Sequence, residues 1–367
     1  MILPLFFSIF VACAVIQITY YILFSTFLFG SKKDENNIPE VPVSVIIYTK
    51  NQAKNLPQFI PLIMDQEHSK FEIVLINNAS SDNTSEVLEL FAKKYANLKV
   101  LNIENNEAFW GSKKYALTLG IKASKYDNLL FTDTKSKPVS KYWVSEMSKK
   151  FTSKKTIVLG YRKYQKENSL LNIFIRFENL LTAIKCFGIT KLGSPYMAFG
   201  TNLAYQKSEF FKVNGFINHM KINAGEGDLF IKDAADRKNT TFCISENSFI
   251  KTDSPNSFLK WFTEKKEETL ITKKHQFKHR FFSGLFSFSK LFFYVLAATL
   301  FFFYPWEIIL SIVLSYFLIQ YIVIGVSIKK LKEPQIIFFL PFLEIGLLLI
   351  QISIFSANLI SKPDHWK

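Results

Sequence analysis

The chain has 367 residues, with 45 Lys and Arg against 30 Asp and Glu, which gives a formal net charge of +15. That length fits one α/β domain of about 230 residues plus membrane segments. The positive charge suits an anionic membrane face and anionic substrates. No basic-aromatic module or known nucleic-acid fingerprint occurs, so nucleic acid is excluded as a partner. The three cysteines show no metal or disulfide spacing, which fits a reducing compartment.

The chain begins with an apolar stretch, residues 1–30, that contains no charged residue and is long enough to span a bilayer. A cleaved signal peptide would have a basic start and a small-residue cleavage site, and neither is present. We therefore expect a transmembrane anchor. Basic residues follow it at Lys32 and Lys33, and they also precede the next apolar stretch, from Lys273 to Arg280. The positive-inside rule then places residues 31–280 in the cytosol, beneath the inner (plasma) membrane.

The segment after the anchor alternates between short apolar runs and amphipathic stretches. The pattern predicts strands over residues 43–49, 71–78, 98–103 and 128–133, and helices over 54–66, 83–95 and 111–125. Such alternation is typical of βαβ units, so we expect an α/β fold with a mainly parallel sheet. Ligands of these sheets bind at the carboxyl ends of the strands.

Polar side chains follow each of these predicted strands. They are Thr49 to Asn51, Asn77 with Asn78, Glu104 to Asn106, and Asp133. Four polar clusters at one sheet edge predict a nucleotide site there. No G-x-G-x-x-G or P-loop pattern occurs, so a dinucleotide or NTPase site has no motif support.

The second half of the segment is less regular. Residues 156–161 are expected to form a strand and 170–187 a helix. Two acids, Glu226 and Asp228, lie in a Gly-containing loop just before an apolar helix start. They either stabilise the helix N-terminus or provide a general base near the sheet edge.

Three further apolar stretches close the chain, at residues 281–303, 306–328 and 335–360. The last contains Pro341 and Glu344, so it either spans the bilayer or lies at its interface. We expect a transmembrane anchor at 1–30, a soluble domain at 41–280 and C-terminal transmembrane helices at 281–360.

Residues 41–280 resemble the membrane-bound family 2 glycosyltransferases, which have a GT-A fold. The resemblance rests on six segments in order: VSVIIYTKNQAKNL, FEIVLINNASSDNT, GSKKYALTLGIKAS with LLFTDTKSKP, PYMAFGTNLAYQKSEFF with NGF, GEGDLF, and FLKWFTEKKEET. It implies a GT-A sheet flanked by helices, with transmembrane helices at both ends. The implied activity transfers a sugar from a nucleotide-sugar to a lipid or lipid-linked saccharide at the cytosolic membrane face.

The resemblance also assigns roles to residues. Glu226 would be the catalytic base, with Asp228 as the competing base. Asp133 would contact the ribose or the metal-bound diphosphate. The remaining donor contacts would be Thr49, Asn51, Gln52, Asn78 and Asp82, and the acceptor-side residues would be Gly200, Asn202, Trp261, Lys265 and Lys266.

The chain departs from the family pattern where the chemistry occurs. Gln52 stands where the family has Glu, Asn77 where it has Asp, and Lys135 replaces the second acid of D-x-D. The family uses a divalent cation, Mg²⁺ or Mn²⁺, but Lys135 removes a ligand and leaves Asp133 as the one carboxylate for it. Lys135 would then neutralise the diphosphate itself.

The membrane-surface motif also departs, with Glu264, Glu267 and Glu268 in place of Gln, Arg and His. Together these losses leave an alternative open. The chain would then be a catalytically degenerate family member that acts as a binding or partner protein.

Overall fold

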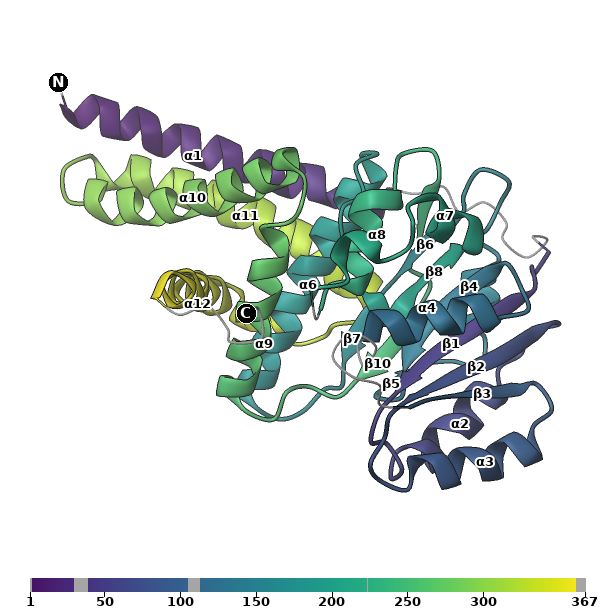
Figure 1. Cartoon of the computed structure of the whole chain (residues 1–367). Helices are drawn as coiled ribbons and strands as arrows, with labels where there is room; N and C mark the ends of the chain where they lie inside the picture. Colours follow the sequence, from purple (N-terminus) through teal and green to yellow (C-terminus); the bar gives the residue numbers. More distant parts are fainter. Residues whose placement is uncertain (1, 30–38, 105–112, 223, 361–367) are drawn as a thin grey trace.

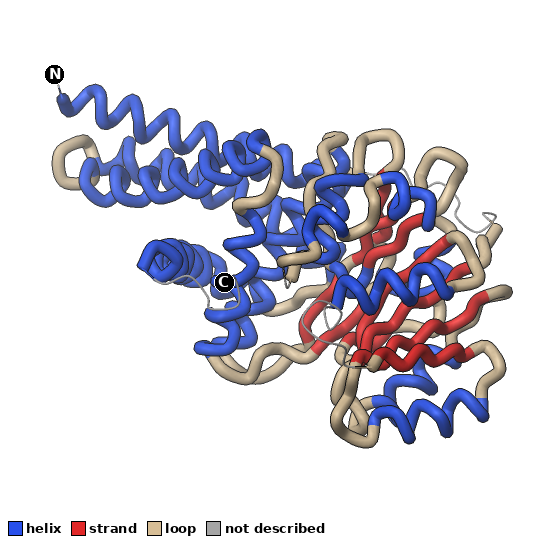
Figure 2. Tube along the Cα trace, viewed as in Figure 1, coloured by secondary structure: helices blue, strands red, loops and turns tan. Residues whose placement is uncertain are grey.

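The computed structural model describes residues 2–29, 39–104, 113–222 and 224–360. A sheet with helices on both faces forms one part, and a group of long helices extends from it (Figure 1). Figure 2 shows the strands gathered in the sheet part, away from the long helices. Asn105 and Asn106, expected at the sheet edge, lie outside the described residues.

The main sheet has seven strands in the order β3-β2-β1-β4-β8-β6-β9. β8 runs antiparallel to both of its neighbours, and the other pairings are parallel. The predicted α/β, mainly parallel GT-A fold class is confirmed. The strands are β1 (Val43–Thr49), β2 (Phe71–Asn78), β3 (Leu98–Ile103), β4 (Asn128–Asp133), β6 (Ile157–Gly160), β8 (Leu203–Gln206) and β9 (Thr240–Cys243). A second sheet joins β5 (Ser136–Pro138), β10 (Ile250–Thr252) and β7 (Arg162–Tyr164).

Alternating residues of the buried strands enter two separate cores. In β1, Val45 and Ile47 pack with Phe59 of α2, whereas Ile46 faces the other core, which contains Ile121 of α4. This two-sided burial explains the continuous apolar strands. The helices of the domain are α2 (Leu56–Met64), α3 (Thr84–Lys94), α4 (Lys113–Ala123), α5 (Trp143–Ser148), α6 (Leu170–Lys191), α7 (Lys207–Lys212), α8 (Glu226–Ala234) and α9 (Phe258–Thr272).

Within the described residues, four helices are long and apolar enough to cross a membrane. They comprise α1 (Ile2–Ser25), which continues into η1 (Thr26–Leu28), then α10 (Phe277–Leu300), α11 (Trp306–Leu331), and η6 (Ile336–Phe339) followed by α12 (Leu340–Ile360). The predicted apolar stretches therefore all form helices at the two ends of the chain.

The first helix packs closely against the sheet domain. At Gly188 of α6, a Cβ atom would lie 2.5 Å from the Phe24 carbonyl oxygen of α1, so only glycine allows this approach. Thr26 donates a hydrogen bond to the Gly188 carbonyl at 3.3 Å. The domain and the membrane helices thus share one apolar core that includes residues of α1, α6, α10 and α11.

Candidate functional site

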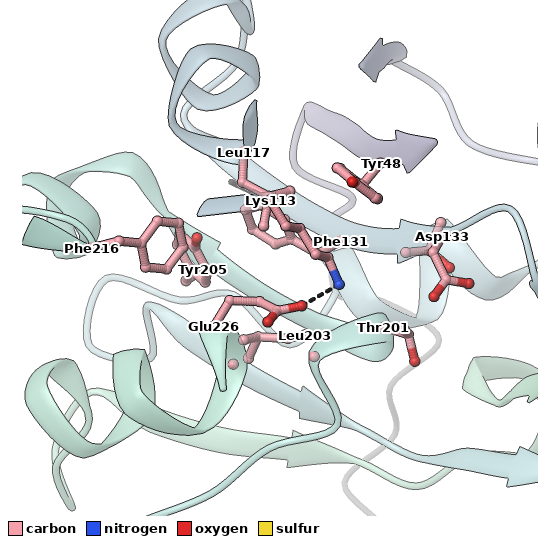
Figure 3. Close-up of a pocket in the computed structure, with 13 residues that line it drawn as sticks. Tyr48, Lys113, Leu117, Phe131, Asp133, Thr201, Leu203, Tyr205, Phe216 and Glu226 are labelled. Atoms are coloured by element: carbon pink, nitrogen blue, oxygen red, sulfur yellow. Dashed lines mark ion pairs between the residues drawn. The ribbon is translucent and has the colours of Figure 1, made fainter. Parts of the chain in front are cut away.

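A pocket opens where β1 and β4 end, at the carboxyl edge of the sheet. Its empty volume is about 380 Å³, counting the space open to solvent. Asp133 and Glu226 lie on its walls, with the Lys113 ammonium between them in Figure 3. Its lining consists of Tyr48, Lys113, Leu117, Phe131, Thr132, Asp133, Gly200, Thr201, Leu203, Tyr205, Phe216, Glu226 and Gly227.

Glu226 forms an ion pair with Lys113 across this pocket (Figure 3). Burial alone would raise the pKa of the Glu226 carboxyl, but the charges of Lys113 and Lys114 outweigh burial and lower that pKa below its usual value. The carboxylate is therefore ionised and paired before any substrate binds. An ionised carboxylate on the wall of a pocket is what a general base requires.

The segment before Glu226 is fixed by Lys114, the next residue of α4. Its buried ammonium donates to the carbonyls of His219, Ile222 and Ala224 at 2.9, 2.6 and 2.9 Å. Burial lowers the pKa of Lys114 to about 8. The first turn of α4 thus provides Lys113, which pairs with Glu226, and Lys114, which holds the segment just before Glu226.

Glu226 and Asp228 point in different directions because both lie in the first turn of α8. Two residues along a helix turn by about 200°, so their side chains lie on opposite faces. Asp228 is absent from the pocket lining and accepts a hydrogen bond from the Ala198 amide at 3.0 Å. Burial raises the pKa of Asp228 to about 7. Of the two acids, Glu226 is therefore the one on the pocket wall.

Glycines allow α8 to approach the pocket floor. Gly225 has a φ of +77°, which L-residues with side chains rarely adopt. At Gly227 a Cβ atom would lie 2.9 Å from the Cα atom of Gly200. The predicted acceptor-side residue Gly200 therefore forms part of the pocket through its backbone.

The turn after β4 carries Asp133 and Lys135 in different environments. Asp133 Oδ1 accepts the Lys135 backbone N–H at 3.0 Å, which leaves the other carboxylate oxygen for a ligand. The Lys135 side chain is exposed and is absent from the pocket lining. Its role as a phosphate clamp stays a prediction.

The turns after β1 and β2 are joined by hydrogen bonds between their predicted donor-binding residues. Asn51, with a φ of +53°, accepts the Ser81 amide on Oδ1 at 2.8 Å. Asp82 accepts the Ala53 amide at 3.2 Å, and the Gln52 amide donates to the Thr84 hydroxyl at 2.9 Å. The structure thus brings Asn51, Gln52 and Asp82 together in one pair of turns.

The other two predicted donor contacts lie deeper. Thr49 and Asn78 are each 1% exposed. Asn78 Nδ2 donates to the Tyr48 hydroxyl at 3.1 Å, and Tyr48 lines the pocket and pairs in register with Asp133. Asn78 therefore supports the pocket wall through Tyr48.

Two predicted acceptor-side residues, Asn202 and Trp261, are buried in this structure. Asn202 is fully buried; its amide donates to the carbonyls of Tyr161 and Ser248 at 2.8 and 2.9 Å and accepts from the Trp143 indole at 2.9 Å. Those bonds occupy the side chain within the core. Trp261 is 1% exposed and packs in a small apolar cluster. The acceptor-side role of both residues stays a prediction.

Lys265 and Lys266 lie on α9, apart from the pocket lining. Lys265 is paired with Glu178 at 2.7 Å and with Glu268 at 2.6 Å. Burial opposes its charge, but these two carboxylates outweigh burial and raise the pKa of Lys265 above its usual value. The positive charge of Lys265 is thus already balanced by two carboxylates.

The described residues contain no group of three His, Cys, Asp or Glu side chains placed to hold a metal ion. Asp133 offers one carboxylate at the pocket edge. Mg²⁺ often binds through one or two carboxylates together with substrate phosphates. The residues present fit a dication only if the phosphates of a donor complete its shell.

Sequence reasoning missed Lys113 and Tyr48. The position of Lys113 at the start of α4, at the carboxyl edge of the sheet, was the available signal, because helix N-terminal turns in α/β sheets border the ligand crevice. Tyr48 is one of the alternating residues of β1, and nothing in the pattern distinguishes it from its buried neighbours.

The sheet and the pocket at its carboxyl edge define a class of α/β proteins that bind a ligand there. The comparisons with known proteins give the family. The model of "Glycosyl transferase family 2" matches residues 44–253, more than half of the chain. The chain belongs to glycosyl transferase family 2.

Curated relatives share part of the chain. The chain is 27% identical over 204 residues to "Probable glycosyltransferase YdaM" of Bacillus subtilis. This alignment covers 53% of this chain and 47% of that protein. The chain is also 22% identical over 185 residues to 4,4'-diaponeurosporenoate glycosyltransferase of Staphylococcus haemolyticus, covering 48% and 47%. The chain thus spans about half the length of these relatives.

A solved structure shares the fold. The mannosyltransferase PcManGT of Pyrobaculum calidifontis, in complex with GDP-Man and Mn²⁺, superimposes with a TM-score of 0.58 at 13% identity. The superposition covers 91% of this chain and 100% of the other.

Proposed function

We propose that the chain transfers a sugar from a nucleotide-sugar to a lipid or lipid-linked saccharide at the cytosolic face of the membrane. The observation that carries this proposal is the pocket in which Glu226, Lys113 and Asp133 face one another beneath the joined turns of β1 and β2. The membership in glycosyl transferase family 2 and the name of the Staphylococcus haemolyticus relative support the reaction class.

In this mechanism the nucleoside lies along the turns after β1 and β2, and the sugar enters the pocket. An acceptor hydroxyl attacks the anomeric carbon while Glu226 takes its proton, and the bond from that carbon to the diphosphate breaks. General base catalysis of this kind contributes about 10²–10⁴ in rate. A dication held by Asp133 and the diphosphate would supply Lewis-acid stabilisation of the leaving group.

Lys113 has two roles in this account. It keeps Glu226 ionised in the empty pocket, and it offers a positive charge where the leaving diphosphate develops negative charge. When the ammonium turns to the phosphates, Glu226 loses its counter-ion and becomes the stronger base.

The acceptor class follows from the position of the domain beside long apolar helices. α6 contacts both α1 and α12 and shares their core, so the domain lies against the membrane helices. A lipid-bound acceptor would reach the domain without leaving the bilayer.

The test is a panel of nucleotide-sugars incubated with the purified full chain in lipid nanodiscs. Release of nucleoside diphosphate and transfer of label to extracted lipids are measured, each with and without EDTA. The proposal expects one donor to turn over, and transfer to require lipid. Binding of a donor without turnover under any metal would favour the catalytically degenerate alternative.

A further inference from the structure

The last apolar helix, α12, lies along the catalytic domain for its whole length. Near its start, a Cβ atom at Gly346 would lie 2.6 Å from the ring of Phe174 in α6. Near its end, the Asn358 amide donates to the Lys266 carbonyl of α9 at 3.4 Å. Ile350, between them, packs against an apolar cluster of side chains from α6 and α9. The helix therefore never leaves the domain.

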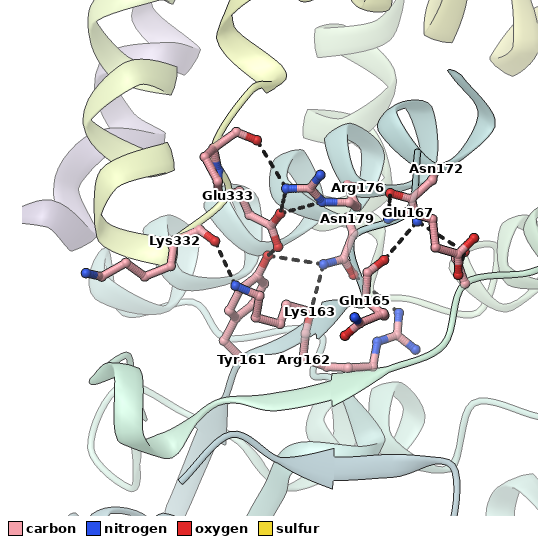
Figure 4. A network of polar contacts seen from close by, with 12 residues as sticks. Tyr161, Arg162, Lys163, Gln165, Glu167, Asn172, Arg176, Asn179, Lys332 and Glu333 are labelled. Atoms are coloured by element: carbon pink, nitrogen blue, oxygen red, sulfur yellow. Dashed lines mark hydrogen bonds and ion pairs between the residues drawn. The ribbon is translucent and has the colours of Figure 1, made fainter. Parts of the chain in front are cut away.

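The chain just before α12 is fixed to the same domain (Figure 4). Glu333 and Arg176 form a fully buried ion pair at 2.7 Å, and the Tyr161 hydroxyl donates to Glu333 at 3.2 Å. The Lys163 ammonium donates to the Lys332 carbonyl at 2.7 Å. The segment that leads into α12 and the last turns of α12 thus both contact the catalytic domain, whereas the ends of a spanning helix lie about 30 Å apart on opposite faces of a bilayer.

The other three apolar helices behave differently. Phe7 of α1 stacks on Tyr304 of the turn between α10 and α11 at 4.7 Å, far along the chain from the docking of Phe24 on the domain. In Figure 1 the helices α1, α10 and α11 are seen from the side and extend away from the sheet. In the same view α12 is seen nearly end-on. α12 therefore crosses the direction of the other three helices, and the four cannot all stand upright in one bilayer.

α12 meets this group of helices at one buried carboxylate. Glu344 pairs with Lys290 of α10 at 2.5 Å and accepts hydrogen bonds from Tyr21 of α1 and Tyr316 of α11 at 3.0 and 2.6 Å. All three partners come from helices that extend away from the domain. The start of α12 is thereby fixed across them, close to the domain.

The exposed face of α12 is apolar. Phe342 and Leu349 are 77% and 59% exposed and lie within about 20° of each other around the helix. Gln351 is about 180° from Phe342, in the phase of the buried Glu344 and Leu347, so it lies on the side of the helix that those buried residues occupy. At the headgroup boundary the apolar face would enter the acyl region.

The charges that follow α12 also fit a helix that does not cross the bilayer. Residues 361–367, SKPDHWK, carry two lysines, whereas the turn between α10 and α11, residues 301–305, carries no charge. By the positive-inside rule the C-terminus lies on the same side as the basic flanks of the catalytic domain. We propose that the chain crosses the bilayer three times, through α1, α10 and α11, and that α12 lies in the leaflet on the catalytic side.

The first test is the side of the membrane on which the C-terminus lies. A cysteine is appended after Lys367, and the controls are Phe303→Cys in the α10–α11 turn and Lys154→Cys on the exposed catalytic domain. The three native cysteines are buried, so an impermeant maleimide reports the added one. The appended cysteine should label together with Lys154→Cys and opposite to Phe303→Cys. Labelling together with Phe303→Cys would overturn the proposal.

The second test measures depth and needs no activity. Spin labels at Phe342→Cys, Leu349→Cys and Ser356→Cys, which share one exposed face of α12, are compared by oxygen and nickel accessibility in nanodiscs. A helix lying in the leaflet gives three similar, shallow depths. A spanning helix gives its deepest value at 349, with 342 and 356 about 20 Å apart along the helix. That second pattern would overturn the proposal even if the C-terminal labelling failed.

Discussion

The donor edge of the sheet and the membrane-facing side of the domain are held together by different forces. At the donor edge, amides and one exposed acid join the two turns through Asn51, Gln52 and Asp82. On the membrane side, buried charges meet in pairs: Arg176 with Glu333, Lys265 with Glu178, and Lys290 with Glu344. Stability should therefore depend on the second region, and ligand binding and turnover on the first.

The largest expected effect is on stability, from Arg176→Ala. The change leaves Glu333 buried without its counter-ion, which costs about 3–5 kcal/mol. Lys141→Ala is the control, because it breaks an exposed pair with Glu67 and should cost at most about 1 kcal/mol. Thermal unfolding in detergent measures both. Equal losses would contradict the claim that buried ion pairs, and not exposed ones, hold the membrane-facing side together.

Glu226→Gln should reduce turnover by about 100-fold or more, because an amide cannot accept the acceptor proton. Donor affinity, measured by calorimetry, should change little, and thermal stability should stay near that of the unaltered chain. Asp228→Asn is the matched comparison on the same helix. Full turnover without Glu226 but none after Asp228→Asn would assign the base to Asp228.

Asp133→Ala should weaken donor binding by about tenfold, because it removes the carboxylate at the pocket edge that would contact the ribose or a bound dication. Calorimetry with and without EDTA measures the change. Affinity that stays the same in both conditions would make Asp133 a strand-end residue with only the local bond to the Lys135 amide.

Lys113→Gln should shift the acidic limb of the activity profile to higher pH. The Lys113 charge lowers the pKa of Glu226, so its removal raises that pKa, and the base is then protonated over a wider acidic range. A profile of kcat/KM against pH measures the shift. An acidic limb that stays in place would mean that another group controls it.

The last prediction concerns the pH dependence of stability at Asp228. Burial raises its pKa from 3.8 to about 7 in the folded protein. The folded state therefore keeps a proton that the unfolded state releases, so this contribution to stability is present below about pH 4 and is lost as pH rises through about 7. Asp228→Asn should flatten that decline, measured as Tm against pH. An unaltered decline in the variant would assign it to other groups.

Much of the sheet could be predicted from the sequence. β1, β2, β3 and β4 agree with the predicted strands residue for residue, because continuous apolar runs between polar turns have few alternatives. The sequence could not give the direction of single side chains. Asn202 and Trp261 were expected to face an acceptor, but each is buried because three-dimensional packing decides which side of a turn or helix is covered.

The candidate site was predicted in part. Asp133 and Glu226 both reach one pocket, as their positions at the sheet edge and at a helix start suggested. The pairing of Glu226 with Lys113 joins residues more than 100 positions apart, and no local pattern reports such a contact. The separation of Glu226 from Asp228 follows from helix phase alone, once the first residue of α8 is known.

The most direct test of the central claim is a structure of the Glu226→Gln variant with the donor found in the nucleotide-sugar panel. The account predicts the nucleoside along the turns after β1 and β2, the diphosphate between Asp133 and Lys113, and the anomeric carbon facing residue 226. A donor bound away from this pocket, or with its anomeric carbon facing Asp228, would contradict it.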